Sequence, residues 1–143
     1  MVDDSLRVRD VMTKDVVTLQ RNDRLLVADD LMRLGRIRHL PVVDETGALA
    51  GIVTQRDLFQ NGLQNALGYG PHTQRPAQDM VVVKTAMKTN VVTTTPDTLL
   101  KEAAKLMQAR DIGCLVVVDE GRIAGILTEA DFVKLLARPH HDP

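Results

Sequence analysis

The sequence predicts an α/β (α+β) protein made of two copies of one β-α-β-β-α unit. The first observation behind this prediction is an internal repeat. A shift of 75 positions aligns VMTKDVVT (11–18) with AMKTNVVT (86–93), and IRHLPVVDE (37–45) with IGCLVVVDE (112–120). The second observation is that short β-branched runs alternate with segments of helical periodicity in both copies.

The first strand and the first helix of each copy can be assigned from composition and spacing. VVTL (16–19) and VVTT (91–94) are β-branched and indicate strands. In the segments that follow, apolar residues lie along one helical face. They are Leu25, Ala28, Leu31 and Met32 in the first copy, and Leu100, Ala103, Ala104 and Met107 in the second. The expected N-caps of these helices are Asn22 or Asp23, and Asp97 or Thr98.

The second half of each unit is predicted to be a hairpin followed by a helix. LPVVD (40–44) and LVVVD (115–119) are apolar runs typical of a strand covered on both faces. A glycine-containing turn follows each run and indicates a hairpin. Beyond that turn the shift between the copies becomes 74, so that ALAGIVTQRD aligns with RIAGILTEAD. The last helix of each copy is expected to start in QRDLF and EADFV.

These elements divide the chain into two units, residues 8–59 and 83–136. Between them, residues 60–82 are rich in glycine and proline, so one continuous helix cannot run through this linker. Its length leaves open whether it carries function or is a tolerated insertion. Residues 1–7 and 137–143 are expected to be flexible termini.

Composition and charge exclude several classes of protein. The formal net charge of -1 favours neither nucleic acid nor a membrane surface. No apolar run approaches the roughly 20 residues that span a bilayer, and we expect a soluble cytoplasmic protein. Cys114 is the only cysteine, which excludes an internal disulfide, and its apolar neighbours indicate a buried side chain. The sequence offers no recognisable nucleophile–base array and no Cys/His pairs at zinc spacing, so we predict neither catalysis, nor a metal site, nor a required cofactor.

The heptamer Gly-x-x-Thr-x-x-Asp occurs twice, as GIVTQRD (51–57) and GILTEAD (125–131). At a helix N-terminus, such an Asp can accept hydrogen bonds from the two vicinal hydroxyls of a ribose, while the Thr hydroxyl and free helical N–H groups can meet phosphate. The Gly permits close approach of another chain or a ligand. The Thr-x-x-Asp spacing is equally that of a capping box, which needs no ligand. Both interpretations remain open.

Taken together, VRDVMTKDVVTL, RHLPVVDETGALAGIVTQRDLF and their counterparts in the second copy resemble the tandem cystathionine-β-synthase (CBS) domain pair, or Bateman module. The resemblance implies two CBS units packed through their sheets about a pseudo-two-fold axis, with two clefts that bind AMP, ADP or ATP, or S-adenosylmethionine. It also implies a homodimer of the stand-alone prokaryotic type that regulates a separately encoded client protein. The alternative is a ligand-free dimerisation or protein-interaction module with vestigial clefts.

The resemblance also implies which residues form each cleft. The first is expected to contain Thr54, Arg56, Asp57, His39, Lys84, Thr89, Ile112 and Gly113. The second is expected to contain Thr128, Asp131, Arg9, Lys14, Ile37 and Arg38. Cys114 and Ala130 stand where the first copy has His39 and Arg56, so the first cleft holds more donors for phosphate on its Thr/Asp side. Whether Arg9 and Arg38 compensate for this in the second cleft is left open. Whether His39 is a pH-sensitive phosphate contact or an ordinary surface histidine remains open.

Overall fold

A computed structural model of the chain describes residues 3–60 and 81–138. The chain separates into two compact units, each with its own three-stranded sheet. Unit 1 comprises Met1–Val16 and Val92–Pro143, and unit 2 comprises Val17–Val91. Nearly all of the predicted linker and the end of the predicted C-terminal tail lie outside the described residues.

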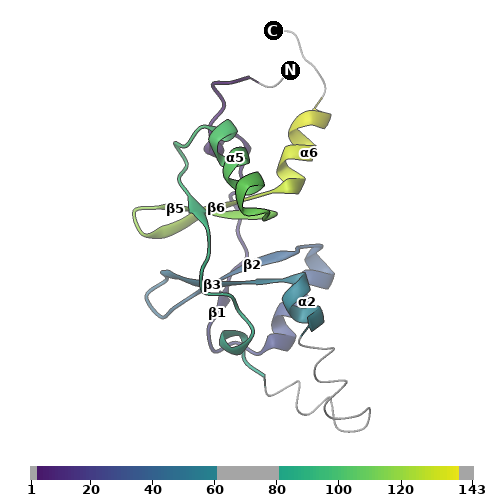
Figure 1. The fold of residues 1–143 in the computed structure, drawn as a ribbon. Coiled ribbons are helices and arrows are strands. Elements are labelled where there is room, and N and C mark those ends of the chain that lie inside the picture. The colour runs from purple at the N-terminus through teal and green to yellow at the C-terminus, as the bar shows by residue number, and fades with distance from the viewer. Residues whose placement is uncertain (1–2, 61–80, 139–143) are drawn as a thin grey trace. The chain divides into compact units, whose positions relative to one another are not determined.

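Unit 2 contains the elements predicted for the first copy, in the predicted order (Figure 1). Strands β1 (Leu19–Gln20), β2 (His39–Val43) and β3 (Leu49–Thr54) form its sheet, with β2 in the middle. Helix α2 (Leu25–Gly35) connects the parallel pair β1 and β2, and β2 and β3 form the predicted antiparallel hairpin. Residues 55–60 are helical. The predicted β-α-β-β-α order is therefore confirmed.

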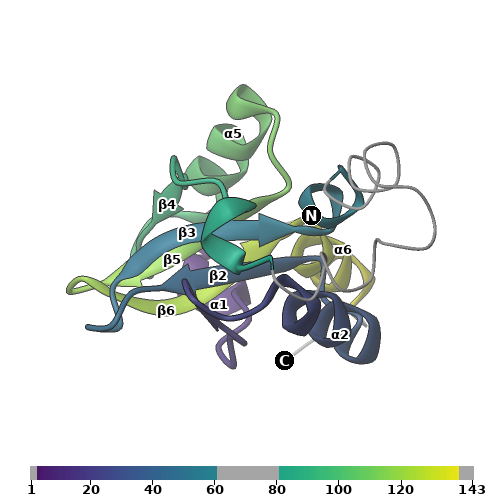
Figure 2. The same ribbon diagram turned by 90° about the horizontal axis from the view of Figure 1, so that it is seen from below.

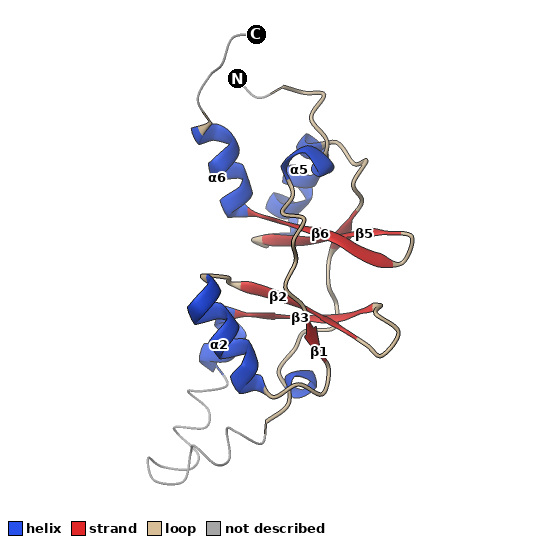
Figure 3. Ribbon diagram, turned by 180° about the vertical axis from the view of Figure 1, so that it is seen from behind, coloured by secondary structure: helices blue, strands red, loops and turns tan. Residues whose placement is uncertain are grey.

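Unit 1 repeats this arrangement. Its strands are β4 (Thr93–Thr94), β5 (Cys114–Asp119) and β6 (Arg122–Thr128), paired in the same order and directions. Its helices are α5 (Leu100–Arg110), between β4 and β5, and α6 (Glu129–Ala137), after β6. Both helices lie on the same face of the sheet (Figure 3). The register shifts at repeat-equivalent positions, between Val42 and Val43 and between Val117 and Val118.

Each unit has an apolar core made of aliphatic side chains and methionine. In unit 2 the buried residues are Leu19, Leu25, Ala28, Met32, Leu40, Val42, Val53 and Val83. In unit 1 they are Val8, Val11, Leu100, Ala103, Met107, Leu115, Val117 and Leu127. The helical stripes predicted from spacing supply the buried faces of α2 and α5, so the predicted amphipathicity is confirmed.

Both cores also contain a short segment that comes from the other copy of the sequence repeat. Helix α1 (Val8–Val11) begins the first copy in the chain, yet Val8 is fully buried in the core of unit 1, which the second copy mainly forms. The 3-10 turn η1 (Val83–Thr85) begins the second copy and buries Val83 in the core of unit 2, which the first copy mainly forms. Seen from below, η1 and α2 lie over the same face of their sheet (Figure 2). We refer to residues 6–14 and 81–89 as the leading segments.

The N-caps predicted for α2 and α5 are wrong. The helices begin after Arg24 and Leu99, neither of which makes a side-chain capping bond. The leading segments satisfy the first helical N–H groups instead. The N–H of Leu25 donates to the carbonyl of Val81 at 2.8 Å, and the N–H of Leu100 donates to the carbonyl of Leu6 at 2.8 Å. Backbone from outside the helix thus takes the place of a capping side chain.

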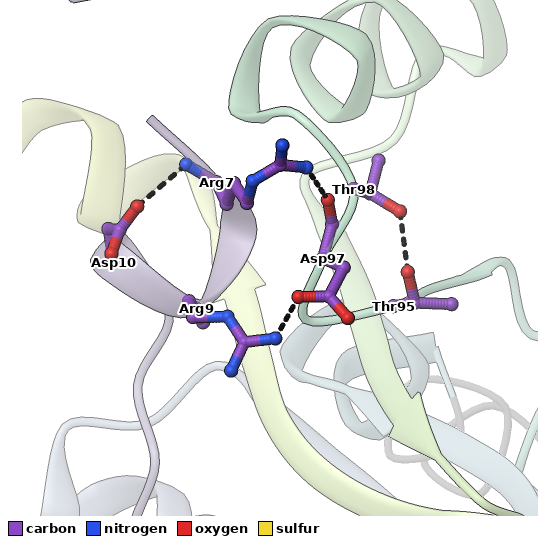
Figure 4. A network of polar contacts seen from close by, with 6 residues as sticks. All are labelled: Arg7, Arg9, Asp10, Thr95, Asp97 and Thr98. Atoms are coloured by element: carbon purple, nitrogen blue, oxygen red, sulfur yellow. Dashed lines mark hydrogen bonds and ion pairs between the residues drawn. The ribbon is translucent and has the colours of Figure 1, made fainter. Parts of the chain in front are cut away.

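The expected capping residues have other partners. The carboxylate of Asp23 accepts the N–H of Gln20 at 2.8 Å and closes the turn after β1. Asp97 forms an ion pair with Arg9, and its carbonyl accepts a hydrogen bond from Arg7 (Figure 4). The hydroxyl of Thr98 is hydrogen-bonded to that of Thr95 at 2.7 Å. The contacts of Arg7 and Arg9 with Asp97 join α1 to the loop before α5.

Candidate ligand-binding site

The heptamer of the second copy caps helix α6. Thr128 is the N-cap, and its N–H donates to Oδ2 of Asp131 at 2.9 Å. The Thr128 hydroxyl also donates to Oδ2, at 3.4 Å. Asp131 lies in the first turn, where the positive end of the helix dipole favours a carboxylate, and is only 5% exposed. The capping box expected from the Thr-x-x-Asp spacing is therefore present.

The heptamer of the first copy has the same geometry. The N–H and the hydroxyl of Thr54 donate to Oδ2 of Asp57 at 2.8 and 2.9 Å, and the N–H of Asp57 donates back to the Thr54 hydroxyl at 3.3 Å. Asp57 is 7% exposed. In both copies the cap uses the Oδ2 atom, so Oδ1 is the atom through which the two carboxylates meet other groups.

The contacts of Oδ1 differ between the two copies. The hydroxyl of Thr13 donates to Oδ1 of Asp131 at 2.9 Å. The ammonium nitrogen of Lys88 lies 3.7 Å from Oδ1 of Asp57 and forms an ion pair with it. Thr13 and Lys88 are repeat-equivalent, because a shift of 75 positions superposes VMTK on AMKT. One position of the repeat therefore places a neutral donor on one carboxylate and a cation on the other.

Backbone pairing holds the two leading segments in place. Thr13 and Ile126 exchange two N–H to carbonyl bonds of 2.9 Å, and Lys88 and Ile52 do the same at 2.9 Å. The heptamer glycines make this approach possible. A Cβ on Gly125 would lie 2.8 Å from the carbonyl oxygen of Thr13, and one on Gly51 would lie 2.7 Å from that of Lys88. The close approach expected at these glycines is thus made by another stretch of this chain.

The strand opposite each heptamer begins with His39 or Cys114. His39 pairs with Thr54 across β2 and β3, and Cys114 pairs with Thr128 across β5 and β6. Cys114 is buried, as predicted, and burial, followed by the charge of Asp131, raises the pKa of its thiol to about 12. His39 is half-buried and is the first residue of β2. Its role in a ligand site stays a prediction.

The first helical N–H groups after each heptamer already have partners. The N–H of Gln55 donates to the carbonyl of Arg38 at 2.9 Å, and that of Glu129 donates to the carbonyl of Gly113 at 3.1 Å. The expectation that free N–H groups at these positions meet phosphate is therefore wrong for Gln55 and Glu129.

Two of the residues expected in the second cleft, Arg9 and Lys14, come together in unit 1. They line an open hollow of about 490 Å³ together with Asp10, Met12, Pro96, Asp119 and Ala124. Thr128 and Asp131 do not line this hollow, and Arg9 is paired with Asp97 there. The structure thus brings Arg9 and Lys14 to one place, with acidic neighbours, on the same leading segment whose Thr13 contacts Asp131.

The other expected residues are distributed over both units. Arg56, Lys84 and Thr89 are exposed in unit 2, as is Arg38. Ile37 and Ile112 pack against the cores of their own units. Gly113 lies against Glu129, whose carboxylate would be 2.5 Å from a Cβ at that position. The assignment of Ile112 and Gly113 to a site with Asp57, and of Ile37 and Arg38 to a site with Asp131, stays a prediction.

Sequence reasoning missed Thr13 and Lys88, the residues that contact the heptamer carboxylates. It selected their neighbours Lys14 and Thr89 instead. The repeat gave no sufficient signal, because positions 13 and 88 differ between the copies together with the pairs 11 and 86, 14 and 89, and 15 and 90. No helix among the described residues is long and apolar enough to cross a membrane. Within 3–60 and 81–138, no three His, Cys, Asp or Glu side chains gather as a metal ion would require.

Comparison with known proteins supports the resemblance seen in the sequence. The family model described as the CBS domain matches residues 8–63 and 83–138. A CBS domain-containing protein of Dictyostelium discoideum is 34% identical over 132 residues, covering 92% of this chain and 91% of that protein. Several other relatives are longer proteins, and the chain spans only 23–42% of their length.

Two solved structures match the whole fold. The structure of CBSX2 in complex with AMP is 26% identical, with a TM-score of 0.74, and the match covers 92% of this chain and 96% of that one. The CBS domain pair of protein MJ0100, in complex with 5′-methylthioadenosine and S-adenosylmethionine, is 30% identical, with a TM-score of 0.74 and coverage of 91% and 94%. Both similar proteins bind adenosine derivatives.

Proposed function

The chain belongs to the CBS domain family, and on this basis we propose that it is a regulatory module that binds an adenine nucleotide or a related adenosyl ligand. Binding takes place at the heptamers and modulates a separate client protein. AMP, ADP and ATP are the ligands expected at the Asp57 heptamer. The module regulates and does not catalyse.

The observation that carries this proposal is the pair of buried carboxylates. Asp57 and Asp131 are two of the three buried polar side chains in the described part of the chain. In each, the cap uses Oδ2, while Oδ1 meets a side chain from a leading segment. A carboxylate oxygen has two lone pairs, so Oδ1 retains capacity for a ribose hydroxyl. Capping and ribose recognition are therefore compatible in the same residue.

Binding regulates a client only if the ligand prefers one state of the protein. The effect on the client can be no larger than the difference in the ligand's affinity for the two states. The leading segments are the parts best placed to respond, since each contacts a heptamer carboxylate and also contributes Val8 or Val83 to a core. A ligand that displaces Thr13 or Lys88 from Oδ1 acts directly on these segments.

Thermal unfolding in the presence of AMP, ADP, ATP, 5′-methylthioadenosine and S-adenosylmethionine tests the proposal. A ligand at 100 times its dissociation constant adds about 2.7 kcal/mol to the free energy of unfolding. For a chain of this length, the midpoint should rise by about 5–10 °C. No shift with any of the ligands, confirmed by titration calorimetry, would contradict adenosyl binding.

Isosteric variants then locate the site. Asp57→Asn and Asp131→Asn keep an oxygen for the cap but replace the second acceptor with an NH₂ donor, which cannot accept a ribose hydroxyl. We expect each variant to unfold cooperatively and to lose binding at its own heptamer. Asp30→Asn, on an exposed part of α2, is the matched control and should bind as the wild type does. Unchanged binding in both heptamer variants would leave the capping box as their only role.

A dimerisation or interaction role has an observation of its own. Val133 and Leu136 on α6 are large apolar side chains, yet they are 64% and 72% exposed. We propose that two copies of the chain associate, and that these side chains take part. Association and ligand binding are compatible, and the dimer is the form through which a client would sense the ligand.

A further inference from the structure

The two heptamers present opposite electrostatic surroundings. Lys88 lies against Asp57, and Arg56 precedes Asp57 in the chain, so two cations accompany one carboxylate. Beside Asp131, the equivalent positions hold Thr13 and Ala130, and Glu129 replaces Gln55. The first heptamer is therefore cationic, and the second is anionic. The difference arises at three pairs of repeat-equivalent positions, 13 and 88, 55 and 129, and 56 and 130. Lys14, the equivalent of Thr89, adds a cation to unit 1, but it lines the hollow with Asp10 and Asp119, which Asp131 does not line.

The backbone at positions 13 and 88 is placed in the same way in both units. Each residue exchanges two 2.9 Å hydrogen bonds with the strand that leads into its heptamer. Each carboxylate makes the same cap to its threonine N–H, at 2.8 Å for Asp57 and 2.9 Å for Asp131. Because the backbone and the caps have the same geometry in both units, it is the side chain at position 13 or 88 that changes the charge next to Oδ1.

Lys88 is available to a ligand. Its side chain is 57% exposed, and its nitrogen lies 3.7 Å from Oδ1, beyond hydrogen-bond distance. An ion pair that exposed and that long is weak, so little opposes a turn of the ammonium group toward a phosphate. Thr13 has no comparable reach, and its hydroxyl already donates to Asp131.

We propose that Lys88 and Thr13 set the charge selectivity of the two heptamers. The Asp57 heptamer takes an adenosine derivative that carries phosphate, with Lys88 and Arg56 as its counter-ions. The Asp131 heptamer takes an adenosine derivative without phosphate, neutral or cationic at the 5′ position, because a phosphate there would face Asp131 and Glu129 without Lys88 or Arg56. This inference rests on the proposed function, since it divides adenosyl ligands between the two heptamers.

Reciprocal substitutions in the full chain test the inference by calorimetric titration. AMP is the anionic probe, 5′-methylthioadenosine the neutral one and S-adenosylmethionine the cationic one. Lys88→Gln should weaken AMP binding about tenfold, as the loss of one charge-assisted contact predicts, and leave 5′-methylthioadenosine unchanged. The salt dependence of AMP binding should also fall, because one ionic contact is lost. Thr13→Lys should weaken S-adenosylmethionine binding and strengthen AMP binding at the second heptamer.

A matched control separates the local charge from the net charge. Lys101→Gln removes the same charge from an exposed position of α5, outside both heptamers and both leading segments, and should leave all three affinities unchanged. Equal AMP affinity in wild type and Lys88→Gln would overturn the charge selectivity while leaving the proposed function standing. If the wild type binds none of the three probes, both fail. If Lys88→Gln weakens all three equally, the residue acts on folding or shape, and the charge selectivity is overturned.

Discussion

Thr13 and Asp131 are 118 residues apart in the chain, and the hydroxyl of Thr13 donates to Oδ1 of Asp131 at 2.9 Å. This bond joins the start of the first sequence copy to the heptamer of the second. A matching contact occurs in unit 2, where Lys88, near the start of the second copy, contacts Asp57 in the heptamer of the first. Each compact unit therefore needs a piece of the other copy, and neither sequence copy contains a complete core by itself.

Truncating a buried valine in a leading segment should weaken one unit only. Val8 is fully buried with Leu100 and Leu115. Val8→Ala removes two buried methyl groups and leaves a cavity, which should cost about 2 kcal/mol of unfolding free energy. Hydrogen exchange should accelerate in β5 and β6, at sequence positions far from the substitution.

Val83→Ala is the matched variant for unit 2 and should accelerate exchange in β2 and β3. Val17→Ala, at a position that is 39% exposed, is the control and should change exchange little. Faster hydrogen exchange in β2 and β3 of the Val8→Ala variant, with β5 and β6 unaffected, would contradict the packing of residues 6–14 into unit 1.

The heptamer glycines should be intolerant of even one extra carbon. In Gly125→Ala, the new Cβ would lie 2.7 Å from Sδ of Met12 and 2.8 Å from the carbonyl oxygen of Thr13, and the backbone contact cannot be relieved by a side-chain rotation. We expect a loss of about 1–3 kcal/mol in the free energy of unfolding by chemical denaturation. The Thr13–Asp131 hydrogen bond should loosen at the same time.

Gly35→Ala is the comparison for this prediction. Its Cβ would meet only the end of the Ile37 side chain, at 3.0 Å, and alanine favours the helix that Gly35 ends. The two effects should nearly cancel and leave stability within about 0.5 kcal/mol of the wild type. Equal losses in the Gly125 and Gly35 variants would show that close approach of the leading segment is not the reason for the heptamer glycine.

Most of the fold could be predicted from the sequence because each helix and strand pattern occurs in both copies of the repeat. The stripe from Leu25 to Met32 and its counterpart from Leu100 to Met107 have helical spacing in both copies, and the β-branched runs have strand composition. The packing of each leading segment into the unit that the other copy mainly forms could not be predicted. Val8 and Val83 occupy equivalent, equally apolar positions, so no local property indicates which core receives which valine.

The candidate site was predictable to the same extent. Thr54 with Asp57, and Thr128 with Asp131, have a spacing that both capping and ribose recognition require, and the caps are present. Thr13 and Lys88 lie outside any motif and reach the carboxylates through backbone pairing to Ile126 and Ile52. Such pairing is a tertiary contact, which spacing along the chain does not encode.

Cys114 should make the protein less stable in alkali. Burial raises the pKa of its thiol from 9.0 to about 12, so between these values the unfolded chain releases a proton that the folded chain keeps. Unfolding is then favoured as the pH rises, and the contribution of Cys114, complete below pH 9, is lost progressively toward pH 12. The loss should amount to a few kcal/mol.

Denaturant unfolding between pH 8 and 11 measures this effect against Cys114→Ala. The variant lacks the thiol, so its stability should fall less steeply with pH than that of the wild type, whatever the lysines and Tyr69 contribute to both. The native thiol should also resist alkylation at pH 8 and react once the chain is unfolded. Parallel pH profiles together with rapid native alkylation would show that Cys114 is not held as a buried, protonated thiol.

The exposed apolar side chains of α6 should control self-association. Replacing Val133 and Leu136 with lysine places two charges where we propose a contact between copies, and the loss of even one buried aliphatic side chain is worth about 1.5–3 kcal/mol. Sedimentation equilibrium should show a dimer in the wild type and a dissociation constant at least about tenfold higher in the variant. Gln108→Lys, at an exposed position of α5, introduces the same residue elsewhere and should leave the dimer intact. A wild type that sediments as a monomer at every concentration would contradict the proposed dimer. A dimer equally stable in the α6 variant would move its interface to another surface.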